Sequence, residues 1–228
     1  MKMRFEKCRQ LIGSAALEKL ENAKVAVFGV GGVGGFVAEA LARSGVGGLC
    51  LVDKDVVDET NVNRQIVALT DTIGMYKTDV MKERIMRINP DAAVEIYREF
   101  YLPENAGFTD IAKYDYVVDA MDNVTAKTEL ICRCKAAGTP VISAMGAGNR
   151  LDPTKLKTAD ISRTDTCPLA RIMRKQLSCR GVTGVKTVYS TEIPIKTEAG
   201  RAPASMMPVP AAMGLIIAAE VIRDLMGK

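Results

Sequence analysis

A glycine loop between two short apolar runs constrains this chain more than any other feature. The first apolar run covers residues 25–28, and the glycine-rich sequence GVGGVG occupies positions 29–34. A helical pattern follows at residues 36–43, and a second apolar run at 49–52 ends on Asp53. A strand, a glycine turn, a helix, a strand and an acid in this order predict a βαβ nucleotide-binding unit.

The chemistry of such a unit is local. Glycines let the backbone approach a phosphate closely, and the free N–H groups at the start of the next helix carry positive partial charge. Asp53 lies 24 positions after Gly29, where a carboxylate can accept hydrogen bonds from a ribose. The pattern therefore predicts a bound nucleotide, but it does not distinguish one nucleotide from another.

The rest of the chain continues the alternation of strands and helices. Strands are predicted at residues 93–97, 114–120, 140–144, 156–161 and 185–195. Helices are predicted within residues 1–20, before Asn89 with Thr72 as the cap, and at 125–136, 168–177 and 211–226, with a loop at 198–210.

We therefore expect an α/β fold with a Rossmann-like, doubly wound, mostly parallel sheet and a smaller, irregular α+β C-terminal part. Residues 1–228 are predicted to form a single domain. Residues 1–149 would be the nucleotide-binding core, and residues 150–228 would bind the substrate.

The composition excludes several kinds of chemistry. The chain contains no histidine, so no imidazole can act as a base or a zinc ligand. Its six cysteines form no CxxC pair, and we see no signal peptide, which favours a cytoplasmic protein with free thiols. The apolar run at 209–219 has eleven residues, fewer than the roughly 20 of a membrane-spanning helix.

Positive charge is concentrated in the last third of the chain. Residues 150–201 hold eleven Lys/Arg and five Asp/Glu, a net charge of +6, whereas the whole chain carries +4. A basic region of this kind is typical of proteins that bind nucleic acid or phosphate-bearing substrates, but it can also be a solvated face.

Polar motifs follow the strands whose carboxyl ends would meet at one edge of the sheet. TNVNRQ occupies positions 60–65, Lys77 opens the next helical region, and DAMD ends the fourth strand at positions 119–122. Together with the glycine loop, these motifs resemble the ThiF/MoeB family, the prokaryotic relatives of ubiquitin-activating enzymes, over about residues 9–148. The resemblance implies a protein that binds ATP and adenylates a carboxylate.

The resemblance also implies a role for each matching residue. The glycine loop lines the phosphates, Asp53 takes the ribose hydroxyls, and Asp122 holds Mg²⁺. The implied ATP-binding residues are Gly29, Gly31, Gly32, Gly34, Asp53, Asn61, Arg64, Lys77 and Asp122. The implied catalytic residues are Arg64, Lys77, Asp122 and Arg9. Arg9 matches an arginine that reaches into the partner subunit's site, which implies a homodimer; Asp119 remains an alternative to Asp122, and Arg4 to Arg9.

Elementary chemistry agrees with this set of residues. An acyl-adenylate forms when a carboxylate anion attacks an already anionic phosphate, so the barrier is largely electrostatic. Arg, Lys and Mg²⁺ would lower it by neutralising the phosphates. The attacking carboxylate has no proton to lose, so a site without histidine is compatible with the reaction.

Further short motifs resemble the branch of the family that dehydrates threonylcarbamoyladenosine in tRNA. They are ALARSG at 40–45, RINP at 87–90, DPT at 152–154 and PLAR at 168–171. That branch lacks the zinc-binding CxxC pairs usual in activators of sulfur carriers. The implied reaction adenylates the threonyl carboxylate, closes a ring through the carbamoyl nitrogen and releases AMP. The alternative is an adenylyltransferase for the Gly-Gly end of a small, ubiquitin-like sulfur carrier.

The basic C-terminal third would then contact tRNA. The candidate residues are Arg150, Lys155, Lys157, Arg163, Arg171, Arg174, Lys175 and Arg180. Cys167 and Cys179 lie in the same region and could be exposed, and Cys167 stands where the family pattern commonly has an acid. A thioester-forming role for either thiol stays open, as do sulfur-transfer proteins as partners.

Overall fold

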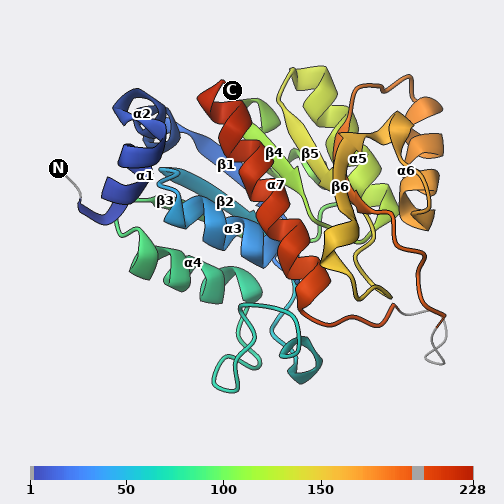
Figure 1. Ribbon diagram of the computed structural model, residues 1–228, viewed down its shortest axis with the longest axis horizontal. Helices are drawn as coiled ribbons and strands as arrows, with labels where there is room; N and C mark the ends of the chain where they lie inside the picture. Colours follow the sequence, from blue (N-terminus) through green and yellow to red (C-terminus); the bar gives the residue numbers. More distant parts are fainter. Residues whose placement is uncertain (1–2, 197–202, 228) are drawn as a thin grey trace.

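One twisted sheet organises the molecule. In the computed structural model, which describes residues 3–196 and 203–227, seven strands are hydrogen-bonded in the order β3-β2-β1-β4-β5-β7-β6 (Figure 1). They are β1 (Lys24–Phe28), β2 (Gly48–Val52), β3 (Ala93–Tyr97), β4 (Tyr116–Asp119), β5 (Val141–Ala144), β6 (Leu156–Asp160) and β7 (Lys186–Ser190). Every pair of neighbours is parallel except β6 and β7. The predicted doubly wound, mostly parallel sheet is confirmed.

Helices cover both faces of this sheet. On one face lie α3 (Gly34–Arg43), α4 (Lys77–Ile88) and α7 (Pro208–Met226), and α2 (Ser14–Asn22) packs beside α7 after the short α1 (Glu6–Ile12) (Figure 1). On the other face lie α5 (Val124–Ala137) and α6 (Pro168–Ser178). Short 3₁₀ helices in the described residues are Met3–Phe5, Glu59–Asn61, Ala106–Phe108, Ile111–Lys113, Pro153–Lys155 and Ile161–Arg163.

Strand β1 lies at the centre of the core and is buried on both sides. Val25 and Val27 belong to the apolar cluster beneath α3 and α7, whereas Ala26 and Phe28 belong to the cluster beneath α5. All four side chains are inaccessible to solvent. This explains why the run is continuously apolar, since parallel strands covered on both faces need apolar residues at every position.

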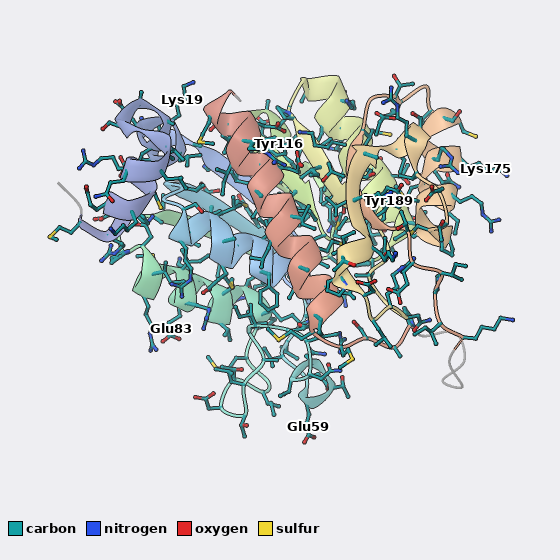
Figure 2. The ribbon with its side chains drawn as sticks, viewed as in Figure 1. Lys19, Glu59, Glu83, Tyr116, Lys175 and Tyr189 are labelled. Atoms are coloured by element: carbon teal, nitrogen blue, oxygen red, sulfur yellow. The ribbon has the colours of Figure 1, made fainter. Side chains whose placement is uncertain are left out.

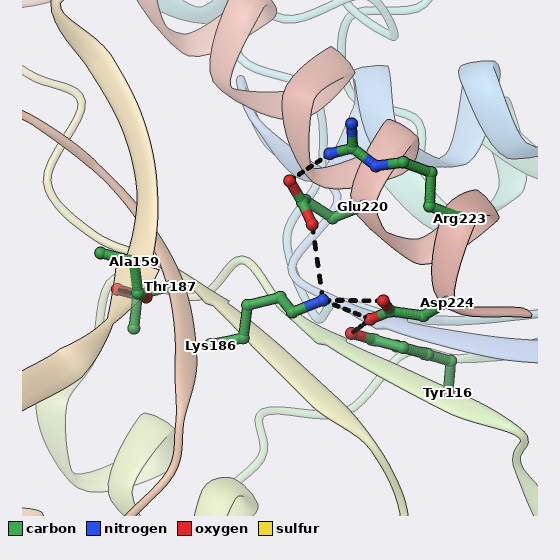
Figure 3. A network of polar contacts seen from close by, with 7 residues as sticks. All are labelled: Tyr116, Ala159, Lys186, Thr187, Glu220, Arg223 and Asp224. Atoms are coloured by element: carbon green, nitrogen blue, oxygen red, sulfur yellow. Dashed lines mark hydrogen bonds and ion pairs between the residues drawn. The ribbon is translucent and has the colours of Figure 1, made fainter. Parts of the chain in front are cut away.

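A polar network ties α7 to two strands of the sheet (Figure 3). The ammonium of Lys186 on β7 lies 2.6 Å from the carboxylate of Asp224 and 3.4 Å from that of Glu220. Tyr116 on β4 donates to the same Asp224 carboxylate at 2.7 Å, and Arg223 pairs with Glu220. Residues of the predicted parts 1–149 and 150–228 are therefore joined in one sheet and by one network.

Two local predictions were wrong. Helix α4 begins at Lys77, with Tyr76 before it, so Thr72 does not cap it. Instead, the Thr72 hydroxyl donates to the carbonyl of Val67 and accepts from the N–H of Leu69, both at 2.8 Å, and holds a turn together.

The second error concerns the strand predicted at 185–195, which ends at Ser190. Beyond it, the N–H of Thr191 bonds to the carbonyl of Lys155, and the chain turns toward residues 150–155.

The predicted loop 198–210 ends earlier than expected, because Pro208 and Pro210 lie in the first turn of α7, where a missing N–H costs nothing. Residues 197–202 lie outside the described part of the chain.

Helix α7 contains the longest apolar run of the C-terminal region. Val209, Met213, Ile217 and Val221 recur at helical spacing and are all buried. They pack into the cluster beside α3. Among the described helices, none is long and apolar enough to cross a membrane.

Candidate nucleotide-binding site

A cleft with a volume of about 950 Å³ opens where β1, β2, β4 and β5 end. Its lining includes the glycine loop after β1, Asp53 after β2, Asp122 after β4 and residues 144–150 after β5. The chain runs outward from β1 to β2 and β3 and then returns to β4 on the other side of β1. Open α/β sheets bind ligands at such a reversal of strand order, outside the carboxyl ends of the strands.

Two glycines of the loop are required by its folding, and one leaves space. Gly29 has φ +91°, and a Cβ there would lie 2.7 Å from the carbonyl oxygen of Ala120. A Cβ on Gly34 would lie 1.8 Å from the carbonyl oxygen of Gly29. At Gly31 the nearest atom is the Gln65 amide nitrogen at 3.9 Å, so this part of the loop is open for a ligand to approach.

Asp53 fixes the glycine loop against the end of β2. One carboxylate oxygen accepts the N–H of Val30 at 2.7 Å, and the other accepts the N–H of Asp55 at 2.9 Å. Burial raises the pKa of Asp53, although these two hydrogen bonds oppose the shift. Each oxygen keeps a lone pair, so the carboxylate can still accept a hydrogen bond from a ribose hydroxyl.

The two predicted phosphate-binding cations line the same cleft. The Lys77 ammonium, whose side chain is 7% exposed, lies 3.0 Å from the Asp55 carboxylate. Partial burial opposes ionisation of Asp55, but the hydrogen bond and charge of Lys77 lower its pKa overall. Arg64 donates to the carbonyl of Thr60 at 2.8 Å and to the side-chain oxygen of Asn63 at 3.0 Å. Both acceptors are neutral, so the charge of Arg64 remains available to a ligand.

Asn61 shapes the polar loop between β2 and α4 and also lines the cleft. Its side-chain oxygen accepts the N–H of Asp58 at 3.2 Å, while the Asp58 carboxylate accepts the N–H of Thr60 at 2.8 Å. These reciprocal bonds form a capping box over the turn at Glu59–Asn61. Glu59 marks the outer side of this loop (Figure 2).

The acid that ends β4, Asp119, and the acid in the loop after it, Asp122, have different surroundings. Asp119 is fully buried, lies 2.8 Å from the ammonium of Lys127 and accepts the hydroxyl of Ser143 at 2.5 Å. Asp122 is exposed and lines the cleft. The geometry therefore makes Asp122 the acid that can meet a ligand, and Asp119 part of the support beneath it.

Lys127 was not singled out from the sequence. Its ammonium donates to the carbonyls of Met121 at 3.1 Å and Ala144 at 2.8 Å, so it joins the loop that follows β4 to the last residue of β5. Its spacing of three and four residues from the buried Leu130 and Ile131 places it on the inward face of α5. This helical spacing is the signal in the sequence that could have indicated an inward-facing Lys127.

Two residues of the basic region differ from expectation. Arg150 is only 4% exposed and lines the cleft, so it cannot be a surface contact for tRNA. Of the two cysteines that could be exposed, Cys167 is buried at the start of α6 and lines the cleft too, whereas Cys179 is exposed. The burial of Arg150 and that of Cys167 both depend on packing between residues far apart in the sequence.

The other basic candidates lie on the surface, with one exception. Arg174 donates to the carbonyl and hydroxyl of Thr164, at 2.7 and 2.8 Å, and thereby holds the turn before α6. The exposed candidates are Lys155, Lys157, Arg163, Arg171, Lys175 and Arg180. Figure 2 shows Lys175 on the outer side of α6.

Arg9 lies outside the cleft of its own chain. It is on α1, where its guanidinium lies 2.6 Å from the carboxylate of Glu6. Arg4, the alternative, is exposed in the preceding 3₁₀ turn.

No group of three or more His, Cys, Asp and Glu side chains that could hold a metal occurs among the described residues. Mg²⁺ bound to a nucleotide usually takes its ligands from phosphates, water and one or two carboxylates. The exposed carboxylate of Asp122 fits that pattern.

Fold and cleft together define a nucleotide-binding protein of the doubly wound α/β class. The model of the ThiF family matches residues 6–228, and the chain belongs to this family. It is 45% identical to the tRNA threonylcarbamoyladenosine dehydratase of Bacillus subtilis (strain 168), with 97% of this chain and 94% of that protein covered.

Solved structures of a tRNA-modifying dehydratase are also similar to this chain. Crystal structures of the E. coli tRNA N6-threonylcarbamoyladenosine dehydratase, in complex with ATP and with AMP, each match with a TM-score of 0.90 at 36% sequence identity. The match covers 98% of this chain and 94% of the E. coli chain in both cases.

Proposed function

We propose that this protein is an ATP-dependent dehydratase that converts threonylcarbamoyladenosine in tRNA to its cyclic form. The likeness to dehydratases extends over nearly the whole chain. The observation that carries the proposal is the convergence of Arg64, Lys77 and Asp122 on the glycine loop in one cleft. This is the electrostatic arrangement needed to bring a carboxylate onto a phosphate.

The nucleotide would lie over the glycine loop. Asp53 accepts the ribose hydroxyls, and the N–H groups at the start of α3 face the phosphates. Arg64, Lys77 and Asn61 neutralise or donate to the phosphate oxygens. The space beside Gly31 allows the backbone to approach a phosphate without obstruction.

Mg²⁺ would be held by the phosphates and Asp122. When bound, the ion supplies further positive charge at the attacked phosphate. The chain's own part is to present one carboxylate at the end of β4, on a loop that the buried Lys127 keeps in place.

The reaction balances without an added base or oxidant. A carboxylate oxygen of the threonyl group attacks the α-phosphorus of ATP, and pyrophosphate leaves. The carbamoyl nitrogen then attacks the activated carbonyl carbon, its proton passes to solvent, and AMP leaves. The substrate loses the atoms of one water molecule, and proximity of the two reacting groups is provided by the substrate itself.

The exposed cations among residues 155–180 would bind the tRNA backbone. Lys157, Arg171 and Lys175 are free of ion pairs within the described part of the chain. Phosphate contacts of this kind release counterions, so binding should weaken as salt is raised.

The protein would work as a homodimer in which Arg9 reaches the partner's cleft. The position of Arg9 on α1, away from its own cleft, supports a role in trans. Mixing an Arg9→Ala protein with an Asp122→Ala protein tests this. If sites are completed in trans, some mixed dimers contain one intact site, and activity returns when the two inactive proteins are combined.

The function is tested by incubating the protein with ATP, Mg²⁺ and threonylcarbamoylated tRNA. Mass spectrometry of the nucleosides should show loss of one water from the modified adenosine. The alternative, an adenylyltransferase for a small carrier protein, predicts pyrophosphate release only when the carrier is added and no dependence on tRNA.

A further inference from the structure

Arg150 has one donor group that the protein itself does not satisfy. Its Nη1 donates to the carbonyl of Gly148 at 2.9 Å, and its Nε donates to the carbonyl of Glu192 at 3.3 Å. Its Nη2 is buried and has no hydrogen-bond partner among the described residues. An unsatisfied donor on a charged group costs more to bury than one on a neutral group.

The charge of Arg150 is also unpaired within the described chain. Arg150 bonds to the backbone carbonyl of Glu192, whereas the Glu192 carboxylate accepts the N–H groups of Leu151 at 3.1 Å and Asp152 at 3.0 Å. No carboxylate lies within ion-pair distance of Arg150 among residues 3–196 and 203–227. A buried, unpaired charge is costly, and proteins keep one chiefly where a ligand supplies the counter-charge.

The backbone around Arg150 is held in an unusual shape. Asn149 has φ +59°, a left-handed conformation that costs energy for any residue but glycine. Its backbone and side chain exchange hydrogen bonds with Ala204, each at 2.7 Å, and its carbonyl accepts the N–H of Ile195 at 2.8 Å. Three contacts thus fix the turn that brings Arg150 to the cleft.

Apolar side chains line the cleft together with Arg150, among them Met145, Leu169, Ile172 and Pro194. Leu169, Cys167 and Nη1 of Arg150 all lie around Gly146. A site with apolar walls and one buried cation suits a ligand that has an apolar or planar body and a single anionic group.

Arg150 and the two predicted phosphate-binding cations follow different strands of the sheet. Arg64 and Lys77 belong to segments that follow β2, whereas Arg150 follows β5. Strands β1 and β4 separate β2 from β5 in the sheet, so the strands that these residues follow are three strand spacings apart, about 14 Å.

We infer that Arg150 binds the carboxylate of the acyl substrate and presents it to the nucleotide, an inference that rests on the proposed function. Arg150 lines the cleft, and its guanidinium has a second N–H on Nη1 besides the two on Nη2, so it can bond a carboxylate oxygen while Nη1 and Nε remain anchored to the backbone. Arg150 would therefore select a free carboxylate over a neutral group of the same shape.

The test compares two free nucleosides as inhibitors of tRNA turnover. One is threonylcarbamoyladenosine, and the other is its carboxamide, which has the same shape without the charge. Wild-type protein should prefer the carboxylate by about tenfold to a hundredfold, the contribution of one charge-assisted hydrogen bond. Arg150→Gln should bring the ratio close to one, and Arg150→Lys should retain part of it. The ratio is measured within each protein, so it does not depend on how much of a variant is folded.

Arg133→Met is the matched control. Arg133 lies on α5, is paired with Glu129, and does not line the cleft, so its loss removes one positive charge without changing the ratio. A carboxylate preference that persists in Arg150→Gln overturns the inference. So does a weaker affinity for ATP with the preference intact, which would make Arg150 a phosphate contact. Absence of turnover in wild-type protein would instead overturn the proposed function.

Discussion

The ammonium of Lys127 lies 2.8 Å from the carboxylate of Asp119, and neither side chain is exposed to solvent. Two further bonds from Lys127, to the carbonyls of Met121 and Ala144, connect this pair to the loop after β4 and to the last residue of β5. Asp122 lies in the loop after β4, and residues 146–150 lie in the loop after β5. The buried pair thus supports both ends of the proposed reaction site without facing the cleft.

Removing Lys127 should therefore destabilise the protein strongly. Lys127→Met leaves the Asp119 carboxylate buried without a counter-charge, and we expect a loss of about 3–5 kcal/mol in the free energy of unfolding. The measurement is urea denaturation at neutral pH. The double variant Lys127→Met with Asp119→Leu should recover part of the loss, because it removes both charges. A double variant no more stable than the single one would contradict this account of the pair.

Alanine substitutions at two glycines of the loop should affect different properties, one the stability of the fold and the other the binding of ATP. Gly34→Ala should destabilise the fold, because its Cβ would overlap the carbonyl of Gly29. Gly31→Ala should unfold like the wild type but bind ATP more weakly, since the open space beside it is where the phosphates approach. Thermal unfolding and ATP titration of both variants separate the two effects. Wild-type ATP affinity in Gly31→Ala would place the phosphates elsewhere.

The cleft residues should affect turnover far more than stability. Asp122→Ala and Arg64→Ala are each expected to lower kcat/KM by at least about a hundredfold, comparable to the loss of one group that stabilises charge in a transition state. Asp71→Ala and Arg87→Ala remove the same kinds of charge outside the cleft and should leave turnover near the wild-type value. An effect of tenfold or less from both cleft variants would show that the site has been placed wrongly.

Salt dependence should separate tRNA contacts from structural arginines. Each phosphate contact that is lost reduces the slope of log affinity against log salt by about one. Arg171→Ala combined with Lys175→Ala should lower tRNA affinity and this slope, while ATP binding stays unchanged. Arg174→Ala should instead lower stability, because its guanidinium holds the turn at Thr164. An unchanged salt slope in the double variant would remove α6 from the tRNA surface.

Much of the fold was predictable because its signals are local. The apolar runs of β1 and β2 are continuous, and a glycine loop between a strand and a helix is typical of a nucleotide-binding βαβ unit. Asp53 and Asp122 were also predictable, because each lies within three residues of the end of a strand, and parallel strands end at the same edge of the sheet. Their roles in binding ATP and Mg²⁺ remain predictions.

The missed features depend on contacts between distant segments. Arg150 is buried because Glu192 and Ala204 fold back over the turn at Asn149, and nothing near position 150 in the sequence indicates this. Lys127 faces inward because Asp119 is buried opposite it, whereas a lysine is ordinarily expected at the surface. Thr72 has the residue type of a helix cap, but its hydroxyl is used in a nearer turn.

The central claim is that ATP activates the carboxylate of the tRNA-bound threonyl group. It is tested most directly by labelling that carboxylate with oxygen-18 and following one turnover by mass spectrometry. Adenylation makes one carboxylate oxygen the bridge to phosphorus, so ring closure should release AMP carrying one labelled oxygen. Cyclic product formed together with unlabelled AMP, or with ADP and phosphate, would contradict it.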